Sequence, residues 1–150
     1  MKFCEMEYKR PDADSLIHEY AELVAAAKAA DNGDALLELF ARHCELNDEF
    51  EKQSCLSSIR HTLDTRDEFY DDENNFFDRV GPSVANAQLD FYRALLENEH
   101  KDALAAKYGQ ILLDKMNISV NSANEDVIEL MQEENELSSR YQKLYATCTV

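Results

Sequence analysis

The sequence predicts an all-α protein, an elongated antiparallel bundle of about five to six helices. The 150 residues include only three glycines and two prolines, so few positions interrupt a helix. Hydrophobic residues make up 45% of the chain and recur at spacings of three, four and seven, the period of a helix face. A chain of this length can bury one core of modest size.

The first helix is expected to open at Pro11 and Asp12 and to run to about Asn32. Proline fits the first turn of a helix, and an aspartate side chain can cap the exposed backbone amides there. Gly33 then provides a left-handed position that ends the helix, and Asp34 is expected to cap the next one. These residues predict a short turn between two helices.

The second helix is expected to end in the stretch "HTLDT", residues 61–65. Cys44 and Cys55 lie eleven residues apart on one stripe of this helix, which predicts two small core residues. The chain has no Cys-x-x-Cys spacing, so all four cysteines are expected to be reduced thiols. The inner face mixes apolar and small polar side chains: Leu36, Phe40, His43, Asn47, Phe50, Ser54 and Ile59.

A third helix is expected to start at Thr65, which forms a capping box with Glu68. The acidic residues that follow fall in its first turns, where the helix dipole favours negative charge. The pair Gly81-Pro82 predicts a kink or a short break. A packing seam is expected at residues seven apart, with Val80 and Ala87 in the alternate position: Tyr70, Phe77, Val84 and Phe91.

A fourth helix is expected from about Lys101 to Val120, with Gly109 weakening its middle and these apolar residues along it: Leu104, Tyr108, Ile111, Leu112 and Met116. Ser122 and Glu125 form a second capping box, ahead of a fifth helix. Its inward residues are expected to be Val127, Met131, Leu137, Tyr141 and Leu144. The last residues, "TCTV", favour a strand, so the chain is expected to be a piece of a longer protein.

Charge excludes several classes of partner. Fifteen basic residues against 31 acidic ones give a net charge of −16, which repels nucleic acid and anionic membrane surfaces. No run of eighteen apolar residues occurs, and the N-terminus lacks the pattern of a signal peptide. A soluble cytoplasmic protein is therefore expected.

No catalytic residue and no metal site are expected in these 150 residues. None of the four histidines is four residues from another, so the zinc motif His-Glu-x-x-His is absent. Glu97 and His100 form a single Glu-x-x-His match at an expected helix end, and a di-iron site needs two. Ser58 lies near His61, but no oxyanion loop accompanies it, so a buried polar network is the favoured reading.

The stretch "SIRHTLDTRDEFYDDENNFFDRVGP", residues 58–82, resembles the N-terminal segment of the oligoendopeptidase F family, zinc metallopeptidases related to thimet oligopeptidase. The opening "MKFCEMEYKRPD" and the later "LMQEENELSSRYQKL" are similar to that family too. The resemblance therefore covers nearly the whole chain in order.

This resemblance implies a helical enzyme of several hundred residues with a deep channel that closes around short peptides. Its zinc ion, held by the two histidines of His-Glu-x-x-His and a downstream glutamate, activates water for attack on the peptide carbonyl. The resemblance places those ligands beyond Val150. Residues 1–150 would then be an N-terminal channel-wall domain, whose partners are the catalytic domain of the same protein and, in the complete enzyme, short peptides.

The resemblance also marks a group of candidate residues at the joint between the second and third helices: Arg60, His61, Asp64, Arg66 and Tyr70. They would form a charged network that locks the joint, or present cations to the carboxylate end of a peptide. We favour the network, although no spacing here specifies a ligand. The alternative function is a free-standing acidic helical module that binds a partner protein, and an uncovered apolar patch would allow copies of the chain to self-associate.

Overall fold

The structure is a computed structural model that describes residues 5–122 and 128–147. Within these residues it contains six helices and no strand, as predicted. A search of these residues finds no helix that could span a membrane. The helices are α1 (Ala13–Ala29), α2 (Gly33–Leu63), α3 (Glu68–Glu97), α4 (Asp102–Tyr108), α5 (Gln110–Ser122) and α6 (Ile128–Thr147).

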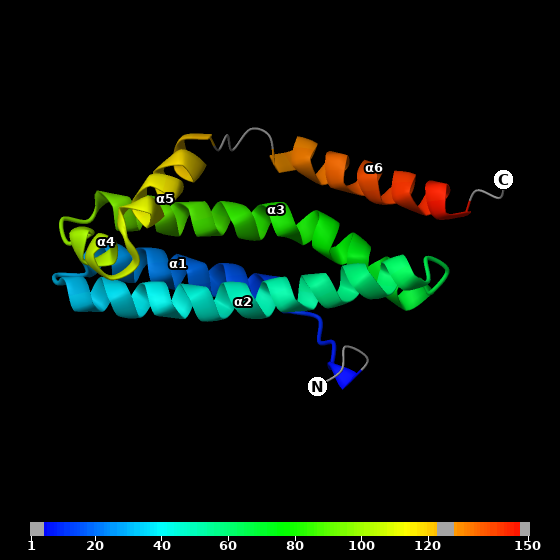
Figure 1. Cartoon of the computed structure of the whole chain (residues 1–150), viewed down its shortest axis with the longest axis horizontal. Helices are drawn as coiled ribbons and strands as arrows, with labels where there is room; N and C mark the ends of the chain where they lie inside the picture. The colour runs from blue at the N-terminus through cyan, green and yellow to red at the C-terminus, as the bar shows by residue number, and fades with distance from the viewer. Residues whose placement is uncertain (1–4, 123–127, 148–150) are drawn as a thin grey trace.

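Three long helices form the body of the molecule (Figure 1). α2 runs antiparallel to α1 and α3, and all three lie side by side along the long axis. α4 lies at one end of this body, while α5 and α6 both pack against α3. The elongated antiparallel bundle expected from the sequence is therefore confirmed.

The predicted turn between the first two helices is partly wrong. Asp12 caps α1 as expected, since its carboxylate accepts a hydrogen bond from the Ser15 amide at 3.1 Å. α2, however, is capped by Asn32, whose side-chain oxygen accepts from the Ala35 amide at 2.9 Å, and not by Asp34. Gly33 begins α2 instead of providing a left-handed turn. Its missing side chain matters for packing, because a Cβ there would lie 2.5 Å from the Cβ of Ala103 in α4.

The start of α3 also differs from the prediction. The cap is Asp67, whose carboxylate accepts hydrogen bonds from the amides of Phe69 at 3.0 Å and Tyr70 at 3.4 Å, and not the Thr65 capping box. α3 continues through Gly81 and Pro82, so no break occurs there. Figure 1 shows α3 changing direction along its length, as a proline within a helix allows.

The predicted fourth helix is divided in two at Gly109. This residue has a φ of 90°, which a residue with a side chain adopts only with strain, and it separates α4 from α5. Ser122 is the last residue of α5, whereas Glu125, Val127 and the expected strand residues 148–150 lie outside the described part of the chain. Thr147 belongs to α6, so the strand prediction is wrong at that position.

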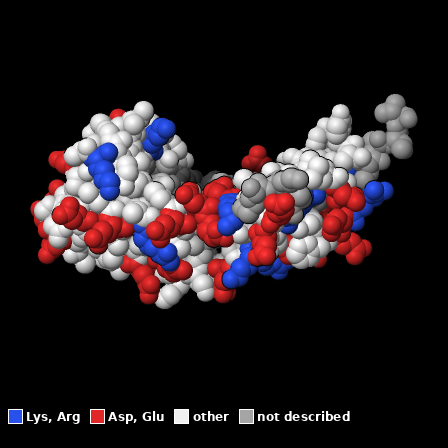
Figure 2. Space-filling model, turned by 60° about the horizontal axis from the view of Figure 1, so that its bottom comes forward, with Lys and Arg blue, Asp and Glu red and all other residues white. Residues whose placement is uncertain are grey.

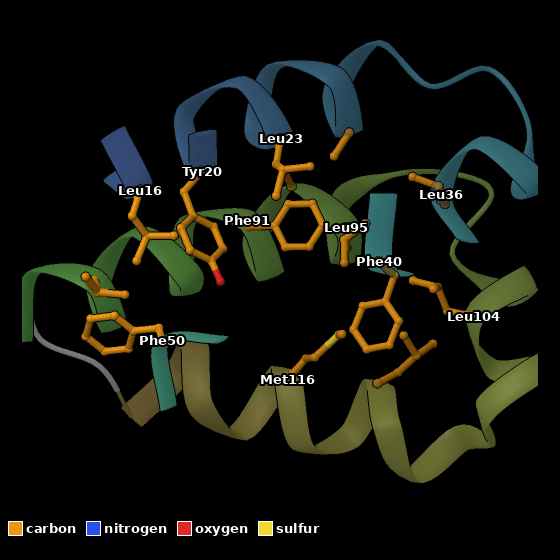
Figure 3. Close-up of a cluster of buried hydrophobic side chains, with 14 of the residues drawn as sticks. Leu16, Tyr20, Leu23, Leu36, Phe40, Phe50, Phe91, Leu95, Leu104 and Met116 are labelled. Carbon is orange, nitrogen blue, oxygen red and sulfur yellow. The ribbon is translucent and has the colours of Figure 1, made fainter. Parts of the chain in front are cut away.

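The core lies between the three long helices and extends under α4 and α5 (Figure 3). In the predicted seam of α3, Phe77, Val84 and Phe91 are buried, and Tyr70 is half-buried. Other buried side chains of the core come from five helices and include Leu16, Tyr20, Leu23, Leu36, Phe40, Phe50, Leu95, Leu104 and Met116.

Several residues predicted to face inward are exposed. Cys55 and Ile59 lie on the outer side of α2, so only Cys44 of the predicted cysteine pair is partly buried. In α4 and α5, the apolar residues Tyr108 and Ile111 are also exposed. The largest correction concerns α6, which turns a polar face toward α3 and exposes the following residues, predicted inward: Met131, Leu137, Tyr141 and Leu144.

Candidate functional site

The joint between α2 and α3 holds a group of interacting side chains that we call the joint cluster: Tyr8, Arg10, Arg60, Tyr70 and Glu73. Arg60 donates a hydrogen bond from Nη1 to the Tyr70 hydroxyl at 2.6 Å, and its guanidinium lies 5.4 Å from the centre of the Tyr70 ring. Its Nη2 also donates to the backbone carbonyl of Met6. Arg60 therefore connects α2, α3 and the segment that precedes α1.

Glu73 is the buried charge of the joint cluster, with 3% of its surface exposed. Arg10 donates from Nε at 2.9 and 3.1 Å and from Nη2 at 2.6 Å to the two carboxylate oxygens, and the Tyr8 hydroxyl donates to Oε2. Burial raises the pKa of Glu73, but the hydrogen bonds from Arg10 and Tyr8 outweigh it and hold this pKa below its usual value. The carboxylate is thus ionised at neutral pH.

His61 belongs to a separate group of polar side chains. Its buried Nδ1 lies 3.8 Å from the Asp71 carboxylate, which accepts a hydrogen bond from Lys143 of α6 at 2.6 Å. Asp71 therefore stands between side chains of α2 and α6, and these three residues connect three helices.

Asp64 and Arg66 form a local pair on the surface. The backbone amide and Nε of Arg66 donate to the same Asp64 oxygen at 3.1 and 3.2 Å, which lowers the pKa of Asp64. The Arg66 side chain is 85% exposed. The five predicted site residues therefore do not form one group. Arg60 is hydrogen-bonded to Tyr70 within the joint cluster, and Asp64 pairs only locally with Arg66. His61 lies apart from both pairs, beside Asp71.

Different consequences are expected for the two arginines. Arg60→Ala should lower the free energy of unfolding by about 1–3 kcal/mol, because it removes hydrogen bonds and stacking at a half-buried site. Arg66→Ala should change it by less than about 0.5 kcal/mol, because exposed pairs contribute little. Urea unfolding followed by circular dichroism measures both. Equal effects of the two substitutions would contradict a locking role for Arg60.

Three members of the joint cluster were missed by sequence reasoning: Tyr8, Arg10 and Glu73. Glu73 stands in an acidic run that is typical of a solvated helix face. A signal was nevertheless present, since Glu73 lies three residues after Tyr70 and four before Phe77, and therefore on the face of the packing seam. No comparable signal marked Tyr8 and Arg10, which precede the first helix.

A second polar network lies inside the bundle around His43, whose side chain is buried. The Tyr20 hydroxyl lies 3.1 Å from His43 Nδ1, and the Tyr92 hydroxyl lies 3.0 Å from Nε2. Gln88 donates to the Tyr20 oxygen at 3.2 Å and to the Asn47 side-chain oxygen at 2.7 Å. Because Tyr20 accepts from Gln88, its own proton is available for Nδ1, which favours the tautomer protonated at Nε2.

Burial around His43 predicts a loss of stability in mild acid. Burial lowers its pKa from the ordinary 6.5 to about 4, with a small opposing effect of Asp48. As the pH falls, the unfolded chain takes up the proton near pH 6.5 and the folded chain only near pH 4, so the unfolded state is favoured across that window. The loss should reach about 3 kcal/mol at the lower limit.

Urea unfolding at several pH values tests this expectation, with His43→Gln as the control that cannot titrate. Glu73, whose pKa is lowered from 4.5, adds to the loss only below that value, and Asp78, whose pKa burial raises, opposes the loss. The difference between the wild type and His43→Gln between pH 6.5 and 4.5 therefore reports on His43. Parallel pH curves for the two proteins in that range would contradict the assignment.

The described residues do not fit a metal ion. Residues 5–122 and 128–147 contain no group of three or more His, Cys, Asp or Glu side chains that could hold one. The joint cluster contains arginine, tyrosine and a single carboxylate, a set suited to fixing the backbone segments that meet there.

Comparisons with known proteins give consistent results. The family model for the peptidase M3 N-terminal domain matches residues 3–123. The fold is similar to PZ peptidase A solved with an inhibitor, at 33% identity and a TM-score of 0.89, over 93% of this chain and 25% of that chain. It is also similar to an oligoendopeptidase F, at 33% identity and a TM-score of 0.89, over 94% of this chain and 25% of that chain.

The fold is similar to an oligoendopeptidase F from Bacillus anthracis as well, at 30% identity and a TM-score of 0.89, over 94% of this chain and 26% of that chain. A comparison with curated protein sequences gives no match. This chain thus spans about a quarter of the length of the solved chains it resembles.

Proposed function

Because the chain belongs to the family of peptidase M3 N-terminal domains, we propose that it forms the N-terminal helical part of a zinc-dependent oligopeptidase that hydrolyses short peptides. In this proposal residues 1–150 are one wall of the substrate channel and carry no catalytic group. The observation that carries the proposal is the likeness to PZ peptidase A, which covers 93% of this chain but only 25% of that one. The other three quarters would supply the catalytic domain.

The long helices are suited to form such a wall. α2 and α3 have 31 and 30 residues, so each is about 45 Å long at the usual rise per residue. The buried network around His43 connects α1, α2 and α3, and the joint cluster holds one end of the layer. A rigid layer of this length supports a channel that excludes folded substrates by size.

Zinc would belong to the catalytic domain, because the described residues of this chain do not fit it. The joint cluster has a structural role in this proposal, since Arg60 is engaged with Tyr70 and the Met6 carbonyl. Arg66, with its largely exposed side chain, is the cation at the joint that a peptide carboxylate would reach.

A second candidate function is a free-standing acidic module that binds a partner protein. One observation favours it: large apolar side chains of α6 are exposed on the side of the helix away from α3. This candidate needs no catalytic domain.

A chimaera tests the leading proposal. The matched first quarter of an oligoendopeptidase F is replaced by this chain, and the cleavage of a short quenched fluorescent peptide is measured. We expect hydrolysis that a chelator abolishes and that zinc restores. This chain alone, and the enzyme without its first quarter, should give none.

Circular dichroism and size-exclusion chromatography establish whether the chimaera is folded. A folded chimaera that binds zinc but leaves the peptide intact would contradict the proposal. Zinc-dependent cleavage by this chain alone would contradict its non-catalytic part.

A further inference from the structure

α6 is attached to the bundle by its polar face. The Ser139 hydroxyl donates to the Asp78 carboxylate at 2.5 Å, and Lys143 pairs with Asp71 at 2.6 Å. The side chain of Gln132 donates to the Arg79 carbonyl at 2.7 Å. These contacts use one side of the helix, because the residues that make them are spaced by seven and four.

The opposite side of α6 carries large apolar side chains that we call the outer stripe: Leu130, Leu137, Tyr141, Leu144 and Tyr145, each more than 60% exposed. Leu130, Leu137 and Leu144 lie seven residues apart along its centre. An amphipathic helix of a single folded domain normally turns this side to the core. An exposed apolar stripe on a helix that is already attached marks a surface for association.

Charged residues along one edge of the outer stripe indicate which kind of partner surface would be complementary to it. Glu133 and Arg140 also lie seven residues apart, about 40° and 60° from Leu137 around the helix at 100° per residue. We propose that the outer stripe pairs with α6 of a second copy of this chain, antiparallel, about a two-fold axis at Leu137. Leu130 then lies opposite Leu144 of the second copy, and Glu133 opposite its Arg140.

Two-fold symmetry repeats both contacts, as a self-complementary interface requires. A parallel pair would instead bring Glu133 beside Glu134 of the second copy, which is unfavourable. Figure 2 shows acidic side chains distributed along one face of the molecule, with fewer lysines and arginines among them, and the net charge is −16, so two copies repel each other at long range. At the outer stripe, by contrast, apolar side chains can be buried while Glu133 of one copy pairs with Arg140 of the other.

This inference does not rest on the proposed function, and sedimentation equilibrium of the chain itself tests it. The average mass should rise toward twice that of the monomer as the protein concentration increases. Leu137→Glu should raise the dissociation constant at least tenfold, because it places two carboxylates on the axis. Ile118→Glu, at a similarly exposed position of α5, is the matched control and should leave it unchanged.

The charge pair tests the antiparallel register. Arg140→Glu should raise the dissociation constant roughly threefold to tenfold, and Glu133→Arg combined with Arg140→Glu should restore it. Circular dichroism confirms that each variant is folded. The proposal is overturned by a wild-type chain that stays monomeric, by a dimer that Leu137→Glu leaves intact, or by a double variant that does not recover. If the wild-type chain is monomeric, the outer stripe would instead be covered by another region of a longer peptidase.

Discussion

Replacing Phe91 by alanine is expected to lower the free energy of unfolding by about 3–5 kcal/mol. Phe91 has no exposed surface, and its ring lies 5.4 Å from that of His43, at the meeting point of α1, α2 and α3 (Figure 3). The substitution removes most of a buried aromatic side chain and leaves a cavity in a closely packed core. Since domains of this size are stable by only about 5–15 kcal/mol, the loss removes a large part of the total.

Phe69→Ala is the matched control, because it removes the same side chain from the same helix at a position that is 54% exposed. Its effect should stay below about 1 kcal/mol. Urea unfolding, followed by circular dichroism at 222 nm, gives both values. Similar losses for the two variants would contradict the position of the core described above.

Arg10→Met is the second substitution with a large expected effect. It leaves the Glu73 carboxylate buried with the Tyr8 hydroxyl as its remaining partner in the joint cluster. The free energy of unfolding at neutral pH should fall by about 2–3 kcal/mol, less than for fully buried pairs because Arg10 is half exposed. The variant should lose less stability than the wild type as the pH falls below 4.5, because its Glu73 no longer has the lowered pKa.

A double variant separates the charge pair from simple packing. Arg10→Met combined with Glu73→Leu removes both charges, so it should recover much of the loss caused by Arg10→Met alone. The effect of Glu73→Leu on the free energy of unfolding is measured in the wild type and again in Arg10→Met. If Glu73→Leu destabilises both proteins by the same amount, the two residues do not interact, which would contradict the joint cluster.

Much of the fold is predictable from the sequence because local signals and tertiary packing agree there. The seam at Phe77, Val84 and Phe91 follows from a seven-residue period, and all three side chains are buried. Asp12 caps α1 because an aspartate before an apolar helical pattern has a clear local role. At Asn32 and Asp67, several residues in a row can cap, and the sequence does not decide among them.

The features that sequence reasoning missed depend on contacts between distant segments. The outward turn of α6 depends on polar partners on α3, such as Asp78, which no pattern within α6 reveals. The break at Gly109 is set by where α5 must pack on α3, since a glycine in a helix can also be tolerated.

The candidate site was also predictable only in part from the sequence. The charge-rich stretch between the second and third helices does lie at a joint, and Arg60 does meet Tyr70 there. The partner of Glu73, however, is Arg10, which is 63 residues away in the sequence. His61 was among the predicted site residues, but its proximity to Asp71, and the pairing of Asp71 with Lys143, depend on how α3 and α6 pack.

Substrate size tests most directly our proposal that this chain forms a wall of a peptidase channel. The chimaera with the catalytic part of an oligoendopeptidase F is given one cleavage sequence in two forms, as a free short peptide and within a loop of a stably folded domain. We expect the free peptide to be cleaved and the folded domain to be left intact. Cleavage of both at similar rates would contradict the claim that these helices enclose the channel.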